Sequence, residues 1–205
     1  MGVVIVESRG EWSREFDSLA ARIAGALGPL AVRIDHIGST SVPGLAAKDV
    51  LDLQVIVRSL EPDEAIPEQF ASIGFTSKLG DLKLRDHVPT GWTGDESAWD
   101  KLLFGPPTGE RPSNVHVRVS GAPNERYALL FRDFLRANDR ARELWGTFKE
   151  QLVAEVGGDR DLYVELKDPA TDVLLTAAEE WARATGWGGP GGQPSPLIYS
   201  PRRWT

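Results

Sequence analysis

Two periods of apolar residues follow one another along the chain, and the change between them predicts its architecture. Up to about residue 120, short apolar runs alternate with polar residues or continue unbroken, which is typical of β-strands. We expect strands at residues 3–6, 30–37, 50–57, 75–78, 83–88, 101–104 and 114–119. The stretch 50–57 is apolar apart from Asp52 and Gln54, which indicates a central strand with polar groups on one face.

Helical spacing predicts a long helix over 12–27, a short one over 62–73 and a helical C-terminal half. Three apolar stripes recur in that half. Their members are Tyr127, Leu130, Phe131 and Phe134; Ala141, Leu144, Trp145, Phe148, Leu152, Val153 and Val156; and Val173, Leu174, Ala177 and Trp181. We expect the third of these helices to run from about Pro169 to Thr185, because Asp168 suits an N-cap and proline suits a first turn.

A mixed sheet followed by packed helices predicts an α/β (α+β) fold with a C-terminal helical region. A chain of 205 residues is long enough for one ordinary domain. We expect that domain over residues 1–187. Residues 188–205 are rich in Gly and Pro and cannot bury a core of their own, so we expect them to form a tail.

Composition narrows the classes of function. The formal net charge of −7 argues against non-specific binding of nucleic acid, because neutralising phosphates requires a surplus of Lys and Arg. The chain contains no cysteine, so disulfides, zinc–thiolate sites and thiol nucleophiles are excluded. The charged N-terminus and the lack of a long apolar run predict no signal peptide and no membrane association, and the expected location is the cytoplasm.

The clearest chemical pattern joins the expected strands 30–37 and 50–57. Gly38 permits a tight turn with exposed amides, and Ser39 and Thr40 add hydroxyls that can reach phosphate oxygens. Asp52 projects from the following strand. A phosphate-binding turn beside a strand-borne carboxylate is what metal-assisted phosphoryl or nucleotidyl transfer requires. The alternative is a purely structural turn, in which the aspartate accepts hydrogen bonds from a neighbouring loop.

Basic residues could complete a binding site for an anion. Lys48 precedes the Asp52 strand, and Arg118 and Lys167 would add further positive charge around phosphates. His116 shares a strand face with Arg118, which makes it the best histidine for a ligand or base. For Lys48, a solvated loop position is the alternative.

Four further residues are possible supporting groups: His36, Gln54, Tyr163 and Trp92. His36 precedes the turn, where it could orient the loop, contact a ligand or be purely structural. Tyr163 could stack or hydrogen-bond, or simply pack. Trp92 belongs to a polar loop, residues 89–100, and we expect this loop to cover the site so that the indole stacks on a base.

The segment HIGSTSVPGLAAKDVLDLQV resembles the signature of the GrpB family, as does the run NVHVRVSGAPNERYALLFRDFLRAN. Tyr163 followed by Lys167 and Asp168 adds to a resemblance that extends from residue 1 to about residue 187. It implies a nucleotidyltransferase-like mixed sheet, related to polymerase β, with a nucleotide site. Similar domains are fused to dephospho-CoA kinase in actinobacteria. The resemblance implies no particular reaction.

The chain departs from the superfamily pattern, which is a Gly-Ser turn, two carboxylates one residue apart and a third on a later strand. Asp52 occupies the first acidic position, but Gln54 occupies the second. The later strand offers His116 and Arg118 in place of an acid. Two alternatives follow: one Mg²⁺ held by Asp52 with His116 and Asp49, or an anionic ligand bound without a metal.

Two functions therefore stay open. One is a metal-dependent nucleotidyltransferase that moves a nucleotide from an NTP to an unknown small acceptor, with Asp52 and His116 as catalytic residues. The other is a non-catalytic domain with a degenerate metal site that binds a nucleotide or CoA-related ligand, or assists folding. The chain lacks GxxxxGK(S/T), GxSxG, HExxH and CxxC motifs, which argues against a P-loop kinase and offers no support for a hydrolase.

Overall fold

The computed structural model describes residues 2–61, 65–78 and 83–189. Within them the strands are β1 (Arg33–Ile37), β2 (Leu51–Val57), β3 (Thr76–Ser77), β4 (Leu84–Arg85), β5 (Asp100–Gly105) and β6 (Ser113–Val119). They form one mixed sheet in the order β1–β2–β6–β5–β3, with β4 paired to β5. β2 and β6 are parallel and the other pairs are antiparallel.

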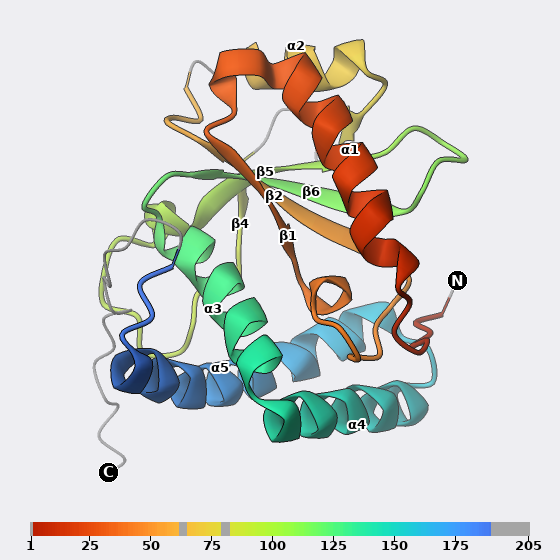
Figure 1. Ribbon diagram of the computed structural model, residues 1–205, viewed down its shortest axis with the longest axis vertical. Helices are drawn as coiled ribbons and strands as arrows, with labels where there is room; N and C mark the ends of the chain where they lie inside the picture. The colour runs from red at the N-terminus through yellow and green to blue at the C-terminus, as the bar shows by residue number, and fades with distance from the viewer. Residues whose placement is uncertain (1, 62–64, 79–82, 190–205) are drawn as a thin grey trace.

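Helices cover both faces of this sheet (Figure 1). The helices are α1 (Glu11–Leu27), α2 (Ala65–Ser72), α3 (Pro123–Ala137), α4 (Asp139–Val156) and α5 (Arg160–Thr185). Short 3₁₀ turns are η1 (Gly28–Leu30), η2 (Ser39–Ser41) and η3 (Glu96–Trp99). α1 and α2 lie on one side of the sheet, whereas α3, α4 and α5 form a layer on the other side.

The sheet face under α1 and α2 is apolar. Alternation along β2 directs Leu51, Leu53, Val55 and Val57 into this layer, because successive side chains of a strand point to opposite faces. The parallel register places Val115 and Val117 of β6 beside them. The cluster also contains Trp12, Ile23, Leu27, Phe70, Phe75 and Phe104. This core leaves the residues at even positions of β2 for the opposite face.

The helical layer has a core of its own. Its buried members are Val42, Leu45, Leu130, Phe131, Phe134, Leu135, Trp145, Leu175, Ala178 and Ala182. α4 begins after Asn138, whose side-chain oxygen accepts a hydrogen bond from the Ala141 amide at 2.9 Å. It ends at Gly157, which adopts the left-handed conformation that favours glycine (φ 59°). These caps set the two ends of α4. Between them the helix passes along the loop that follows β1.

The prediction of a mixed α/β fold with a C-terminal helical region is confirmed. The predicted strand at 3–6 is wrong, since only a single bridge joins Val6 to Ala47. The last helix begins at Arg160 rather than at Pro169, because the side chain of Asp159 caps it. Pro169 therefore lies inside α5 instead of at its first turn.

Two buried faces also differ from the predicted stripes. Leu144 is 52% exposed and Val173 is 75% exposed, although both fall in apolar stripes of the sequence. Conversely, Lys149 of α4 is 3% exposed. The start predicted for α2 at residue 62 and most of the predicted tail, residues 190–205, lie outside the described residues. In the part of the chain that is described, no helix combines the length and apolarity needed to cross a membrane.

Candidate functional site

The turn after β1 and the carboxylate of β2 meet directly. Gly38 has φ +67°, and a Cβ added there would lie 2.6 Å from Oδ2 of Asp52. A side chain at position 38 would collide with that carboxylate, and its backbone conformation would also be strained. The turn continues into η2, where the Ser41 hydroxyl donates to the Gly38 carbonyl at 2.6 Å. The absence of a side chain at Gly38 is what lets the turn and Asp52 share one site.

Asp52 is held by neighbours on β6. Nδ2 of Asn114 donates to Oδ1 of Asp52 at 2.7 Å, and Nε2 of His116 lies 3.8 Å from the same oxygen. Burial alone would raise the pKa of Asp52. The proximity of His116, the hydrogen bond from Asn114 and the charge of Lys48 together outweigh burial and lower that pKa below its ordinary value. The carboxylate is therefore an anion at neutral pH.

A buried chain of polar groups fixes the orientation of His116. Nζ of Lys101 donates to Nδ1 of His116 at 2.9 Å and also contacts Asp86. If Nδ1 accepts this bond, the ring proton of the neutral imidazole sits on Nε2, which faces Asp52. Burial and the charge of Lys101 lower the pKa of His116 to about 4. The neutral ring thus turns Nε2–H toward Asp52 across 3.8 Å, which is longer than a direct hydrogen bond, and a protonated Nε2 does not bind a metal.

Gln54 occupies the position where the superfamily pattern has a second acid, and both of its amide atoms are engaged. Nε2 of Gln54 donates to Asp35 at 2.9 Å, and Arg118 donates to Oε1 of Gln54 at 2.8 Å. Arg118 also donates to Asp86 at 2.9 Å. Arg118 is buried and fully paired in this network, so the geometry does not bring it to the turn as a phosphate ligand.

Cationic side chains from several elements surround Asp52 instead. Lys48 and Lys78 are both attracted electrostatically to Asp52, and each is repelled by Arg160 at the start of α5. Lys167, also on α5, repels Lys48 and donates to Asp168 at 3.0 Å. These four cations face two carboxylates, Asp52 and Asp168, so positive charge is in excess beside the turn, and such an arrangement attracts anions.

Lys149 reaches the turn from the helical layer. Its Nζ donates to Oγ of Ser39 at 3.0 Å and to the carbonyl of Ala46. Burial, followed by the charges of Lys167 and Lys48, lowers the pKa of Lys149 to about 7. An amine that is charged below about pH 7 therefore lies directly against the predicted phosphate-binding hydroxyl.

The remaining residues of the turn face the other side. Oγ1 of Thr40 lies 3.0 Å from Nε2 of His36, and the His36 ring stacks on Phe16 of α1 with centroids 4.6 Å apart. Burial and nearby Arg136 lower the pKa of His36 to about 4. His36 and Thr40 thus brace the turn from the apolar side of the sheet, which is the structural role that the sequence left open for His36.

Asp49 is engaged away from Asp52. Its carboxylate accepts hydrogen bonds from Arg9 at 2.7 Å, from Trp12 at 2.8 Å and from Arg111 at 2.5 Å. These three donors occupy the oxygens that a metal would need. The hypothesis that Asp49 is a metal ligand therefore has no geometric support.

The two aromatic residues predicted as supporting groups, Tyr163 and Trp92, both make contacts within the protein. Tyr163 is buried, and Nζ of Lys48 lies 4.7 Å from the centre of its ring. Burial raises the pKa of Tyr163 to about 12, so its hydroxyl stays protonated. Trp92 packs edge-to-face on Trp99 with centroids 5.4 Å apart. Its indole is therefore occupied by a protein contact in this conformation rather than presented to a base.

The segment before Trp92 is tied to α5. Nε2 of His87 lies 2.9 Å from Oδ1 of Asp172, and the Thr90 amide donates to Oδ2 of the same carboxylate at 3.0 Å. Asp168, one helical turn earlier, lies 4.0 Å from His87. These contacts hold the loop against the helix that carries Lys167, so the loop borders the site.

The residues present fit one magnesium ion better than two. Mg²⁺ is commonly held by one or two carboxylates together with substrate phosphates and water, and Asp52 could supply such a ligand. A second ion has no comparable support, since Gln54 is neutral and bonded to Arg118. Across the described residues, no group of three or more His, Asp or Glu side chains is arranged to bind a metal.

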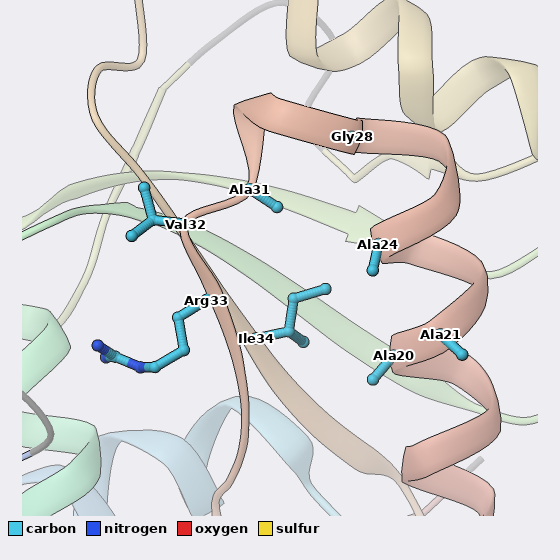
Figure 2. Close-up of a pocket in the computed structure, with 8 residues that line it drawn as sticks. All are labelled: Ala20, Ala21, Ala24, Gly28, Ala31, Val32, Arg33 and Ile34. Atoms are coloured by element: carbon cyan, nitrogen blue, oxygen red, sulfur yellow. The ribbon is translucent and has the colours of Figure 1, made fainter.

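A separate hollow of about 360 Å³ lies between α1 and the start of β1 (Figure 2). It is lined by Ala20, Ala21, Ala24, Gly28, Ala31, Val32, Arg33 and Ile34. Arg33 points away from the alanines and pairs with Asp35 at 2.9 Å and with Glu125 of α3. Because its walls are small and apolar, this hollow offers none of the converging polar groups found around Asp52.

Sequence reasoning missed Lys149, Lys101 and Asn114. Lys149 had a detectable signal: it lies four residues after Trp145 and three before Leu152, within the apolar stripe of α4. A lysine on such a face requires a reason. Asn114 and Lys101 could be recognised only after the strand pairing placed them beside Asp52 and His116.

Comparisons with known proteins agree with this fold. The GrpB protein family matches residues 2–176. A dephospho-CoA kinase of Mycolicibacterium paratuberculosis is 35% identical over 195 residues, which cover 90% of this chain and 48% of that protein. The chain thus spans about half the length of the dephospho-CoA kinases that it matches.

Solved structures give the same result. The crystal structure of the conserved protein GrpB from Enterococcus faecalis aligns with a TM-score of 0.67 and 25% identity, over 90% of this chain and 100% of that one. A cytoplasmic RNA terminal U-transferase aligns over 70% of this chain and 41% of its own, with 14% identity and a TM-score of 0.47, which is too small a similarity to inform activity. The match over most of its length shows that the chain belongs to the GrpB family.

Proposed function

We propose that this chain binds a nucleoside triphosphate with one Mg²⁺ at the Gly38–Asp52 site and transfers its nucleotide to a small acceptor. One observation carries the proposal: Oδ2 of Asp52 would lie 2.6 Å from a Cβ at Gly38, so the turn and the carboxylate open into the same site. Phosphate-binding amides and a metal-binding carboxylate are needed together for nucleotidyl transfer, and here they are adjacent.

The roles of the residues follow from their contacts. The amides and the Ser39 hydroxyl of the turn hold phosphate oxygens, while Lys48 and Lys167 offset phosphate charge. Asp52 would hold a Mg²⁺ bound with the nucleotide, and that ion would neutralise charge on the phosphates. Asn114 orients the carboxylate through its hydrogen bond, and His116, 3.8 Å away, helps to keep it ionised.

A second candidate has one specific observation in its favour. Gln54 replaces a carboxylate and is fixed between Asp35 and Arg118, which removes the usual place for a second metal. A site of this kind would bind a nucleotide or CoA-related anion without catalysing transfer. In that case the domain would serve as a binding or folding-assistance module.

Isothermal titration calorimetry with ATP, GTP, CTP and UTP, each with and without Mg²⁺, distinguishes the two functions. Nucleotidyl transfer requires Mg²⁺-dependent binding that is lost in Asp52→Asn, together with pyrophosphate release when small acceptors are added. Binding without Mg²⁺ dependence and without pyrophosphate release supports the second candidate. No binding of any nucleotide would contradict nucleotidyl transfer and leave the binding or folding-assistance module as the remaining candidate.

Asp49→Asn is the matched control for the loss of a carboxylate. Asp49 pairs with Arg9 and Arg111 rather than with the turn, so its substitution is expected to leave Mg²⁺-dependent binding unchanged once folding is verified by circular dichroism. A loss equal to that of Asp52→Asn would instead restore Asp49 as a metal ligand.

A further inference from the structure

Lys149 is a buried cation whose hydrogen-bond partners are neutral. It is 3% exposed, and its ammonium donates to the hydroxyl of Ser39 at 3.0 Å and to the carbonyl of Ala46. Among the described residues, no carboxylate forms an ion pair with Nζ of Lys149. Buried charges in proteins are ordinarily paired with an opposite charge, because an unpaired charge is costly to remove from water.

The charged groups nearest to Lys149 increase the cost of burying its positive charge. Lys48, in the loop before β2, and Lys167, on α5, both repel it. Glu150, its neighbour on α4, is the one acidic group that acts favourably, and this group does not offset the other effects. The net result is a pKa lowered to about 7, led by burial. The free protein therefore lacks an anion at this point.

We propose that Lys149, with the Ser39 hydroxyl, forms a binding subsite for one phosphate group of the ligand. Nζ of Lys149 and Oγ of Ser39 are already 3.0 Å apart, so one phosphate oxygen could accept hydrogen bonds from both groups. Lys48 and Lys167 would face the same anion from two other elements. The inference rests on the proposed nucleotide site. It adds that the site makes its tightest contact with the polyphosphate of the ligand and not with its base or sugar.

Both α3 and α4 send basic side chains to the loop after β1. Arg132 and Arg136 of α3 donate to the carbonyls of His36 and Ser41. Lys149 of α4 donates to Ser39 and Ala46. A phosphate bound there would join the helical layer to the sheet through one ion pair. Ligand binding would then stabilise the contact between the two layers.

The test uses inorganic tripolyphosphate as the probe, titrated calorimetrically into the full chain without Mg²⁺. Lys149→Met is expected to weaken binding about tenfold or more, since a hydrogen bond to a charged group contributes about 1.5–3 kcal/mol and each 1.4 kcal/mol is a factor of ten. Lys149→Arg should retain part of the affinity. Arg140→Met removes an exposed charge from the same helix and should change affinity less than about twofold.

Proton uptake on ligand binding provides a second test, because a lysine with a purely structural role would not change it. Titrations at pH 8 in buffers of different ionisation enthalpy should show uptake of up to about one proton on binding, because the anion restores the charge of Lys149. Lys149→Met should abolish this uptake. Thermal unfolding of each variant verifies that it is folded before titration.

The outcomes separate this inference from the proposed function. If Lys149→Met binds tripolyphosphate as tightly as the original chain and takes up the same number of protons, the subsite is wrong, whatever the nucleotide titrations give. If tripolyphosphate binds through Lys149 but no nucleotide binds, the subsite stands and the proposed function falls. If the original chain binds neither probe, both are wrong.

Discussion

The two faces of the sheet are made from alternate residues of the same strands, yet they are stabilised in different ways. On one face, Leu53 and Val55 pack against α1 and α2 in a cluster of hydrophobic side chains. On the other, Gln54 and Arg118 belong to a buried chain of hydrogen bonds and ion pairs. The apolar face tolerates small changes of shape. The polar face depends on every partner, because an unpaired buried charge loses its compensation at once.

The comparison also shows where the polar network ends. Its middle is paired, since Asp86 joins Lys101 to Arg118. At the end nearest the turn lies Asp52, to which Lys48 and Lys78 are both attracted. This end of the network is where the proposed ligand would contribute charge.

Removing a partner from the polar face should give the largest loss of stability. Arg118→Met leaves Asp86 and Gln54 without their shared donor, and breaking a buried ion pair costs about 3–5 kcal/mol. Urea unfolding measures the change in the free energy of unfolding. Arg140→Met, which removes an exposed arginine, should stay within about 0.5 kcal/mol. Tolerance of Arg118→Met would contradict the contrast between the faces.

A cavity on the apolar face should have a somewhat smaller effect. Leu53→Ala removes a fully buried side chain between β6 and α1, and such truncations cost about 2–5 kcal/mol. The same urea experiment applies. We expect Leu53→Ala to leave tripolyphosphate affinity within about twofold, since the truncated side chain points away from the turn. A large change in affinity would show that the two faces are coupled.

Lys149→Met should increase the stability of the free protein while it weakens ligand binding. The pKa of Lys149 is lowered in the folded state, so the unfolded chain binds this proton more tightly, and stability rises with pH from about 7 toward the ordinary lysine value. The penalty of burying the charge is therefore fully present below about pH 7. Replacing Lys149 by methionine should raise the free energy of unfolding by about 1–4 kcal/mol at pH 6.

The comparison across pH is the control for this prediction. At pH 10.5 the lysine is neutral in the folded chain and half-protonated when unfolded, so the gain from methionine should be smaller than at pH 6. A gain that is equal at both values would mean that methionine acts by packing alone.

The smallest expected effect concerns the segment 87–90, which is hydrogen-bonded to α5. Hydrogen bonding to Asp172 raises the pKa of His87, so this contact stabilises the protein below the unfolded histidine pKa and is lost as pH rises through the folded value. His87→Gln should reduce the free energy of unfolding by less than about 1 kcal/mol at pH 5.5. The difference in the free energy of unfolding between the two proteins should be smaller at pH 8.5. A difference that grows with pH would mean that the pKa of His87 is lowered, not raised, in the folded state.

Periodicity was sufficient for the sheet and most helices, because long apolar stripes report burial directly. It failed where one helix continues through a proline: the first turns of α5 have no apolar stripe, and the Asp159 cap was hidden among other acids. It also failed for Leu144 and Val173, since neighbouring helices cover only part of each apolar stripe.

The site was predictable only in its local part. Gly38, Ser39 and Asp52 were recognisable because a turn and a strand lie close in sequence. Lys149 lies 110 residues beyond Ser39, and its contact depends on how α4 packs. The roles expected for Arg118 and Asp49 could not be judged from the sequence, because both depend on partners, Asp86 and Arg111, that lie on distant segments.

The end of the sheet at β1 has a consequence for how the protein behaves in concentrated solution. One side of β1 pairs with β2, and among the described residues no strand lies along its other backbone edge. Such an edge can recruit strands from other molecules and seed aggregates. Here the strand is only five residues long and carries Arg33 and Asp35, charged groups that an incoming strand would have to cover. These features discourage stacking of copies edge to edge, which leaves β1 free to present the Gly38 turn.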